Sequence, residues 1–116
     1  MRGSEYIIWP GGEHPFRLGI GELRALEQRC DAGVAVILMR LLGQQWKIDD
    51  VVSTLRIGLM GGGMAERDAQ KAIEAAMDVS SPYSLSVPAA SILTKFIMWE
   101  TDDQPGEPQA GMAKES

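Results

Sequence analysis

Few side chains of this 116-residue chain could carry out a reaction, and the most reactive types occur once each. His14 and Cys30 are its single histidine and single cysteine. One copy of each cannot form a Cys/His zinc site, which needs three or four such ligands. Catalysis by a Cys–His pair would require the two side chains to meet in the fold. We expect His14 to lie solvated in a turn and Cys30 to belong to the core.

Asp49 and Asp50 are the next candidates, since two carboxylates can act as a general acid and a general base. Neighbouring residues of a helix point about 100° apart, which prevents these two from acting as a pair. A carboxylate at the start of a helix instead accepts free backbone N–H groups and complements the helix dipole. We therefore predict that one of them caps the helix that follows.

Two glycine-rich segments are compatible with phosphate binding. Gly19 and Gly21 lie between a candidate strand and a helix, as in a dinucleotide-binding turn, but Arg24 occupies the third small-residue position and no βαβ unit follows. The glycines at 61–63 follow a helix and lack the Lys-Ser/Thr of a phosphate loop. We expect a simple strand-to-helix turn and a flexible interhelix connection, with nucleotide binding as a residual alternative.

Methionines are more informative, because several gather in the second half of the chain. Methionine is flexible and polarizable, so it suits both irregular cores and adaptable binding surfaces. Both interpretations are open for this group. On the second interpretation, the candidate partner-binding residues are Trp46, Met60, Met64, Met98 and Trp99. No residue is assigned a catalytic, cofactor-binding or metal-ligating role, so we expect a non-enzymatic protein without a cofactor.

The elements that position these residues begin with a β-hairpin. Residues 5–9 are rich in strand formers, residues 10–15 are dense in turn residues, and residues 16–18 alternate apolar and polar. A lone hairpin is marginal in water, so it should lie against the helices that follow. The helical segments are 20–30, ended by a left-handed Gly33, then 34–42, 49–60, 65–77 and a last one capped by Ser86 with Pro88 in its first turn.

The segment 49–60 shows both an inward and an outward face. Its apolar residues recur at helical spacing, whereas Ser53, Thr54 and Arg56 are expected to face outward. Gly58 within it costs up to about 1 kcal/mol relative to alanine, which predicts close approach by another element. The sequence thus predicts a mainly α fold, with a short N-terminal hairpin and about five short helices in a compact bundle.

Charge divides the chain into a nearly neutral body and an acidic end. The net charge is −5, and residues 100–116 hold five acidic groups against one lysine. We predict one helical domain over 1–100 and a disordered acidic tail over 101–116. Neither part has the basic field that nucleic acid needs. No apolar run reaches the roughly 18 residues of a membrane span, and the single cysteine and absent secretory signal predict a cytoplasmic protein.

Three blocks of the sequence carry a family resemblance. They are residues 10–27, Trp46 with the following Asp49-Asp50-Val51, and residues 55–63. In this order they resemble the small gene transfer agent family proteins, which are similar to tail assembly chaperones of siphophage-like particles. The likeness covers about residues 5–98. It implies a protein that binds the tape measure protein and keeps it soluble until the tube polymerises around it, with the tail tube protein as a further candidate partner.

The resemblance leaves two functions to compare. The first is a chaperone acting in the cytoplasm of a bacterial host cell during particle assembly. The alternative is a minor structural component of the tail, associated with the tube. Tube subunits are mainly β-sandwich-like, whereas this chain is predicted to be mostly helical, and this contrast favours the chaperone at the level of sequence.

Overall fold

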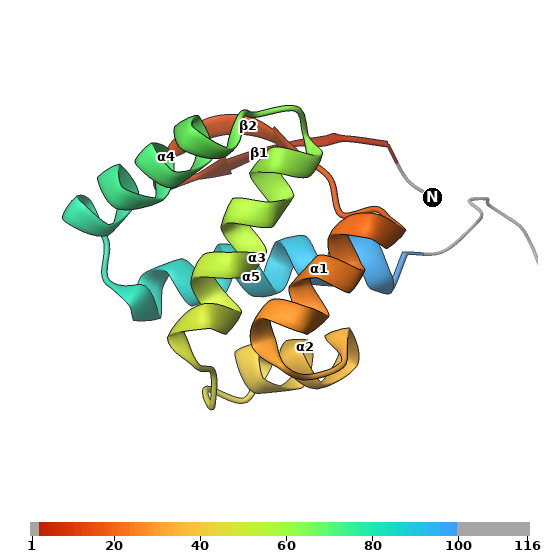
Figure 1. The fold of residues 1–116 in the computed structure, drawn as a ribbon. Helices are drawn as coiled ribbons and strands as arrows, with labels where there is room; N and C mark the ends of the chain where they lie inside the picture. Colours follow the sequence, from red (N-terminus) through yellow and green to blue (C-terminus); the bar gives the residue numbers. More distant parts are fainter. Residues whose placement is uncertain (1–2, 100–116) are drawn as a thin grey trace, which may run out of the picture.

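The computed structural model describes residues 3–99, which form a two-stranded hairpin followed by five helices (Figure 1). The predicted mainly α fold is thereby confirmed, whereas the predicted acidic tail over 101–116 lies outside the described residues. The elements are β1 (Glu5–Trp9), β2 (Gly12–Phe16), α1 (Ile20–Cys30), α2 (Val34–Leu42), α3 (Ile48–Gly61), α4 (Glu66–Val79) and α5 (Pro82–Ile97).

The hairpin is tighter than the sequence suggested. Its strands pair antiparallel with Trp9 opposite Gly12 and Ile7 opposite His14, so only two residues form the turn. The turn-rich residues 10–15 predict a loop of several residues, and this prediction was wrong because most of them belong to β2. Pro15 is accommodated there because its missing N–H is not required at a position that faces away from β1. His14 is half-buried and accepts a hydrogen bond from the indole Nε1 of Trp9 at 2.9 Å.

The connection between α1 and α2 also differs from the prediction. Asp31 has φ 54° and ends α1 in the left-handed conformation, whereas Gly33 has φ −65° and begins α2. An aspartate adopts the left-handed region more readily than most residues, so glycine is not needed at that position. The Glu27 carboxylate then accepts a hydrogen bond from the Val34 N–H at 3.0 Å, which satisfies one free donor at the start of α2.

Helix α3 lies at the centre of the fold and packs against β2 and all four other helices (Figure 1). It is therefore covered on more than the single face that the periodicity predicted. Ser53 and Thr54 are buried, and the Arg56 side chain is only 12% exposed, so their predicted outward orientation was wrong. The Thr54 hydroxyl donates to the Asp50 carbonyl at 2.7 Å, which makes its burial tolerable.

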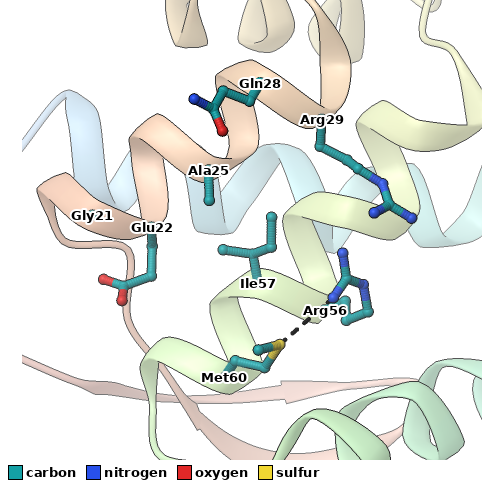
Figure 2. A pocket seen from close by; sticks show the side chains of 8 residues that line it. All are labelled: Gly21, Glu22, Ala25, Gln28, Arg29, Arg56, Ile57 and Met60. Carbon is teal, nitrogen blue, oxygen red and sulfur yellow. Dashed lines mark hydrogen bonds between the residues drawn. The ribbon is translucent and has the colours of Figure 1, made fainter.

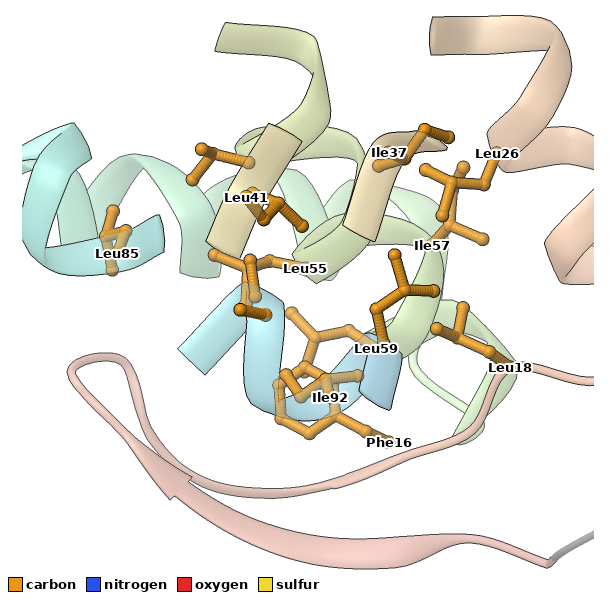
Figure 3. Packing of buried hydrophobic residues seen from close by; sticks show 14 of the residues in the cluster. Phe16, Leu18, Leu26, Ile37, Leu41, Leu55, Ile57, Leu59, Leu85 and Ile92 are labelled. Carbon is orange, nitrogen blue, oxygen red and sulfur yellow. The ribbon is translucent and has the colours of Figure 1, made fainter. Parts of the chain in front are cut away.

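Gly58 confirms the expected close approach. A Cβ at this position would lie 3.0 Å from the Phe16 ring, and the Gly58 carbonyl accepts a hydrogen bond from the Arg17 N–H at 3.0 Å. The hairpin therefore lies against the C-terminal half of α3, and Phe16 enters the core together with Leu59 and Ile92 (Figure 3).

Helix α5 begins earlier than predicted. Ser81, not Ser86, is its N-cap, and the Ser81 hydroxyl accepts a hydrogen bond from the Ser84 N–H at 3.1 Å. Pro88 consequently lies inside the helix. The apolar stripe of α5 is buried across the bundle, and this packing outweighs the local preference of proline for a first turn.

Candidate partner-binding surface

The turn before α1 is closed by a side chain of the helix itself. The Glu22 carboxylate accepts a hydrogen bond from the Gly19 N–H at 2.8 Å and also lies 3.5 Å from an Arg17 guanidinium nitrogen. This helix start, where a dinucleotide phosphate would bind, already holds its own anion. Residues 3–99 contain one antiparallel hairpin and no parallel strands, so the dinucleotide-binding arrangement does not form within them.

Gly61 and Gly62, at the end of α3, are packing residues and not part of the flexible connection that was predicted. A Cβ at Gly61 would lie 1.9 Å from the Arg17 carbonyl oxygen, and one at Gly62 would lie 2.0 Å from the Pro15 carbonyl oxygen. No side chain fits at either position. The glycines therefore let the end of α3 touch the backbone of β2 and the residues just after it, and their role is structural.

The paired aspartates also have structural roles. The Asp50 carboxylate is fully buried, accepts a hydrogen bond from the Lys47 N–H at 2.8 Å, and pairs with Arg40 at 2.8 Å. Lys47, not an aspartate, is the N-cap residue, and Asp50 at the third helical position accepts its N–H, so the predicted capping by this pair takes the form of a capping-box bond from Asp50. Asp49 is exposed, which separates the two side chains as the helical geometry requires.

Cys30 is buried, as predicted, and its thiol donates to the Asp49 carbonyl at 3.4 Å. Burial, together with the nearby Asp50 charge, raises the pKa of the Cys30 thiol to about 12. The thiol is therefore protonated at neutral pH and is a poor nucleophile. Among the described residues, no cluster of three or more His, Cys, Asp or Glu side chains is arranged to bind a metal ion.

The hollow surface lies instead between α1 and α3, where a groove of about 530 Å³ opens (Figure 2). Ala25, Ile57 and Met60 form its apolar floor. The guanidinium groups of Arg29 and Arg56 lie close together along one side, and Arg56 also donates to the Met60 sulfur at 3.6 Å. Glu22 also lines the groove, and an Arg56 nitrogen lies 3.9 Å from the Glu66 carboxylate. An apolar floor bordered by charges of both signs suits a segment that presents an apolar side chain flanked by polar groups.

A second groove, of about 420 Å³, lies between α2 and α5. Leu42 on α2 and Val87 on α5 line it, and Met39 on α2 lies outside it; each of the three side chains is at least 60% exposed. Segment 34–42 has a single charge in nine residues, which indicates a helix that is apolar on all sides. That signal could have identified these exposed residues from the sequence, because one helix in a bundle cannot bury every face.

The predicted partner-binding residues are distributed over both ends of the molecule. Met60 lines the α1–α3 groove, Met64 is half-buried against the core, and Trp46 is half-buried with its ring 6.2 Å from Tyr83. Since α3 is about 20 Å long, Trp46 and Met60 lie at opposite ends of it. Beyond α5, Met98 is 61% exposed and Trp99 is half-buried. Their contact with a partner stays a prediction.

The fold and its surfaces define a small helical protein with grooves between α1 and α3 and between α2 and α5. Among residues 3–99, no helix is both long and apolar enough to cross a membrane. Residues 2–99 match the family described as phage tail tube protein, GTA-gp10, and the chain belongs to this family of gene transfer agent tail proteins. Neither the curated proteins nor the solved structures give a match.

The predicted resemblance to a gene transfer agent family is thereby confirmed, and its chaperone component stays a prediction. The family description names the tail tube, which favours the structural alternative over the chaperone. In the sequence analysis, the contrast between a helical chain and β-rich tube subunits favoured the chaperone. Family membership across nearly all of the described chain outweighs that contrast.

Proposed function

We propose that this protein is a tube-associated structural component of a gene transfer agent tail and acts by binding other tail proteins, not by catalysis. The observation that carries the proposal is the family match over residues 2–99. Supporting it, the reactive side chains of the described residues serve the fold. Cys30 is buried, Asp50 pairs with Arg40, and Glu22 closes the start of α1.

The exposed apolar surface supports a binding role. Val36, Met39 and Leu42 recur at helical spacing on α2, and each is 47–70% exposed. Contiguous apolar surface of this kind marks interaction sites in proteins of this size. The α1–α3 groove adds a second contact area with a different chemistry, because charged side chains of both signs border its apolar floor. A subunit with neighbours on two sides would use both.

Quantitative mass spectrometry of gradient-purified particles tests this proposal. We expect the protein at a fixed ratio to the tube subunit, and absent from the same gradient fractions of a strain that makes no particles. Absence from intact particles would reject the structural role. A strain lacking the gene, complemented by the wild-type gene, checks that tail formation depends on this protein.

A second candidate is a chaperone that binds the tape measure protein in the cytoplasm of the host cell and shields it during assembly. Met60 and Met64, half-buried at the end of α3, favour it, because methionine side chains adapt to varied apolar clients. Co-expression with the tape measure protein separates the two functions. Co-purification with that protein, combined with absence from finished particles, would support the chaperone and reject the structural component.

A further inference from the structure

One edge of the hairpin is covered by the fold. The Arg17 N–H donates to the Gly58 carbonyl at 3.0 Å, and the Pro15 carbonyl oxygen lies directly against Gly62. The backbone groups of residues 15 and 17 therefore point toward α3 and away from β1. Pro15 has no N–H to offer at this edge. Figure 3 shows β2 between β1 and the helices. Only residue 13 of β2 is left with outward backbone groups, so this side of β2 offers no run of groups to a further strand.

The alternation of an antiparallel ladder then determines which groups of β1 point outward. Because residue 15 points away from β1, its cross-strand partner Tyr6 points away from β2, and Ile8 does the same opposite Glu13. The N–H and C=O groups of Tyr6 and Ile8 thus lie along the outer edge of β1. No hydrogen bond from another described element reaches them.

This outer edge carries little that prevents strand addition. Natural edge strands carry charged side chains, prolines or bulges that block pairing. Within residues 5–9 only Glu5, at the start of the strand, is of this kind, and the side chains of Tyr6 and Ile8 are 74% and 80% exposed. An apolar edge with unpaired backbone groups is a site for strand addition.

We propose that β1 pairs antiparallel with β1 of a second copy of this chain, which joins two hairpins into one four-stranded sheet. The twofold axis passes at Ile7, so Tyr6 of each copy lies opposite Ile8 of the other. This register forms four hydrogen bonds between the copies. It also forms two contacts between exposed apolar side chains, each between Tyr6 of one copy and Ile8 of the other. It also places Glu5 opposite Trp9, so the charged residue of the strand does not face itself.

The self-complementary register favours a second copy as the occupant, and the closed edge of β2 explains why assembly stops at two. Each copy offers one open edge, and pairing uses both of them, so the sheet cannot extend into a filament. Such a contact is isologous, the commonest arrangement in soluble homo-oligomers. This inference goes beyond the tail role above and does not depend on it.

Sedimentation of the full chain at concentrations up to about 100 µM measures the association directly. We expect twice the 12.6 kDa of one chain. Ile8→Pro removes an outward N–H without removing a bond of the hairpin, and should give a monomer with an unchanged helical circular dichroism signal. Ile8→Val keeps the N–H and the strand preference, and should remain dimeric. A monomeric wild type, or a folded Ile8→Pro dimer, would overturn the proposal.

Disulfide trapping tests the register and does not depend on the proline variant. Residues directly opposite each other in such a pair have Cβ atoms about 5 Å apart. Mixing the Tyr6→Cys and Ile8→Cys chains under mild oxidation should give a cross-linked dimer that contains one of each. Each variant alone should cross-link far less. Equal cross-linking in the separate samples, or none in the mixture, would exclude this pairing.

Discussion

The Arg40 guanidinium lies 2.8 Å from the Asp50 carboxylate and 3.4 Å from the Cys30 carbonyl, which ties α2 to the start of α3 and the end of α1. The second Asp50 oxygen accepts the Lys47 N–H, so this fully buried carboxylate has partners on both oxygens. One ion pair thus positions α1 and α2 against the central helix α3.

Arg40→Met should destabilise the protein by about 3–5 kcal/mol, because it leaves the Asp50 charge buried without its cation. Methionine keeps most of the aliphatic volume of arginine, so the loss of stability reports on the missing charge. Urea unfolding followed by circular dichroism measures it. Arg24→Met, on the exposed side of α1, is the matched control and should change the free energy of unfolding by less than about 0.5 kcal/mol. Equal effects of the two variants would contradict this account of Arg40.

Gly62→Ala should cost about 2 kcal/mol or more, because the new Cβ would lie 2.0 Å from a backbone oxygen that cannot move without shifting β2. Gly21→Ala is the control within the same chain. Its Cβ would meet nothing within 4 Å, and alanine in a helix is favoured over glycine by up to about 1 kcal/mol. Thermal unfolding should therefore show a lower melting temperature for the first variant and an equal or higher one for the second.

Alkaline pH should destabilise the protein through Cys30. Burial raises the pKa of this thiol from 9.0 to about 12, so above pH 9 the unfolded chain releases a proton that the folded chain retains. Stability from this group is complete below pH 9 and is lost as the pH rises toward 12. Urea unfolding of the wild type and Cys30→Ala in identical buffers should show the wild type losing more stability between about pH 9 and about pH 10.5. If the stability of the two proteins falls in parallel as the pH rises, the raised pKa of Cys30 is contradicted.

Local patterns predicted the helices well, because each combines helical spacing of apolar residues with a start or stop signal. The errors fall where tertiary contacts outweigh such signals. Pro88 was assigned to a first turn, yet burial of the α5 stripe keeps it inside the helix. Ser53 and Thr54 were assigned to the surface, because hydroxyl side chains do not reveal that α3 is surrounded.

The surfaces were harder to predict than the elements. The α1–α3 groove depends on how two helices cross, and no spacing within either helix encodes that relation. Met60 was predicted as a partner-binding residue because methionine suits adaptable surfaces. Arg29 and Arg56, which line the same groove, were not predicted. The ion pair of Arg40 with Asp50 was also missed, although a single charge in an apolar helix is a signal that a buried partner exists.

Filling the α1–α3 groove should block a partner without disturbing the core. Ala25 lines this groove from an exposed position on α1, so Ala25→Trp places a large ring over Ile57 and Met60. Ala75→Trp, at an exposed position on α4, adds the same ring elsewhere and is the control. If tail proteins bind in the groove, Ala25→Trp should weaken their co-purification by at least about tenfold, equivalent to about 1.4 kcal/mol, and the control should not. Equal recovery of tail proteins with both variants would exclude the α1–α3 groove as their binding surface. The exposed apolar residues of α2 and α5 would then be the surface to test, because the two faces are separate on the molecule.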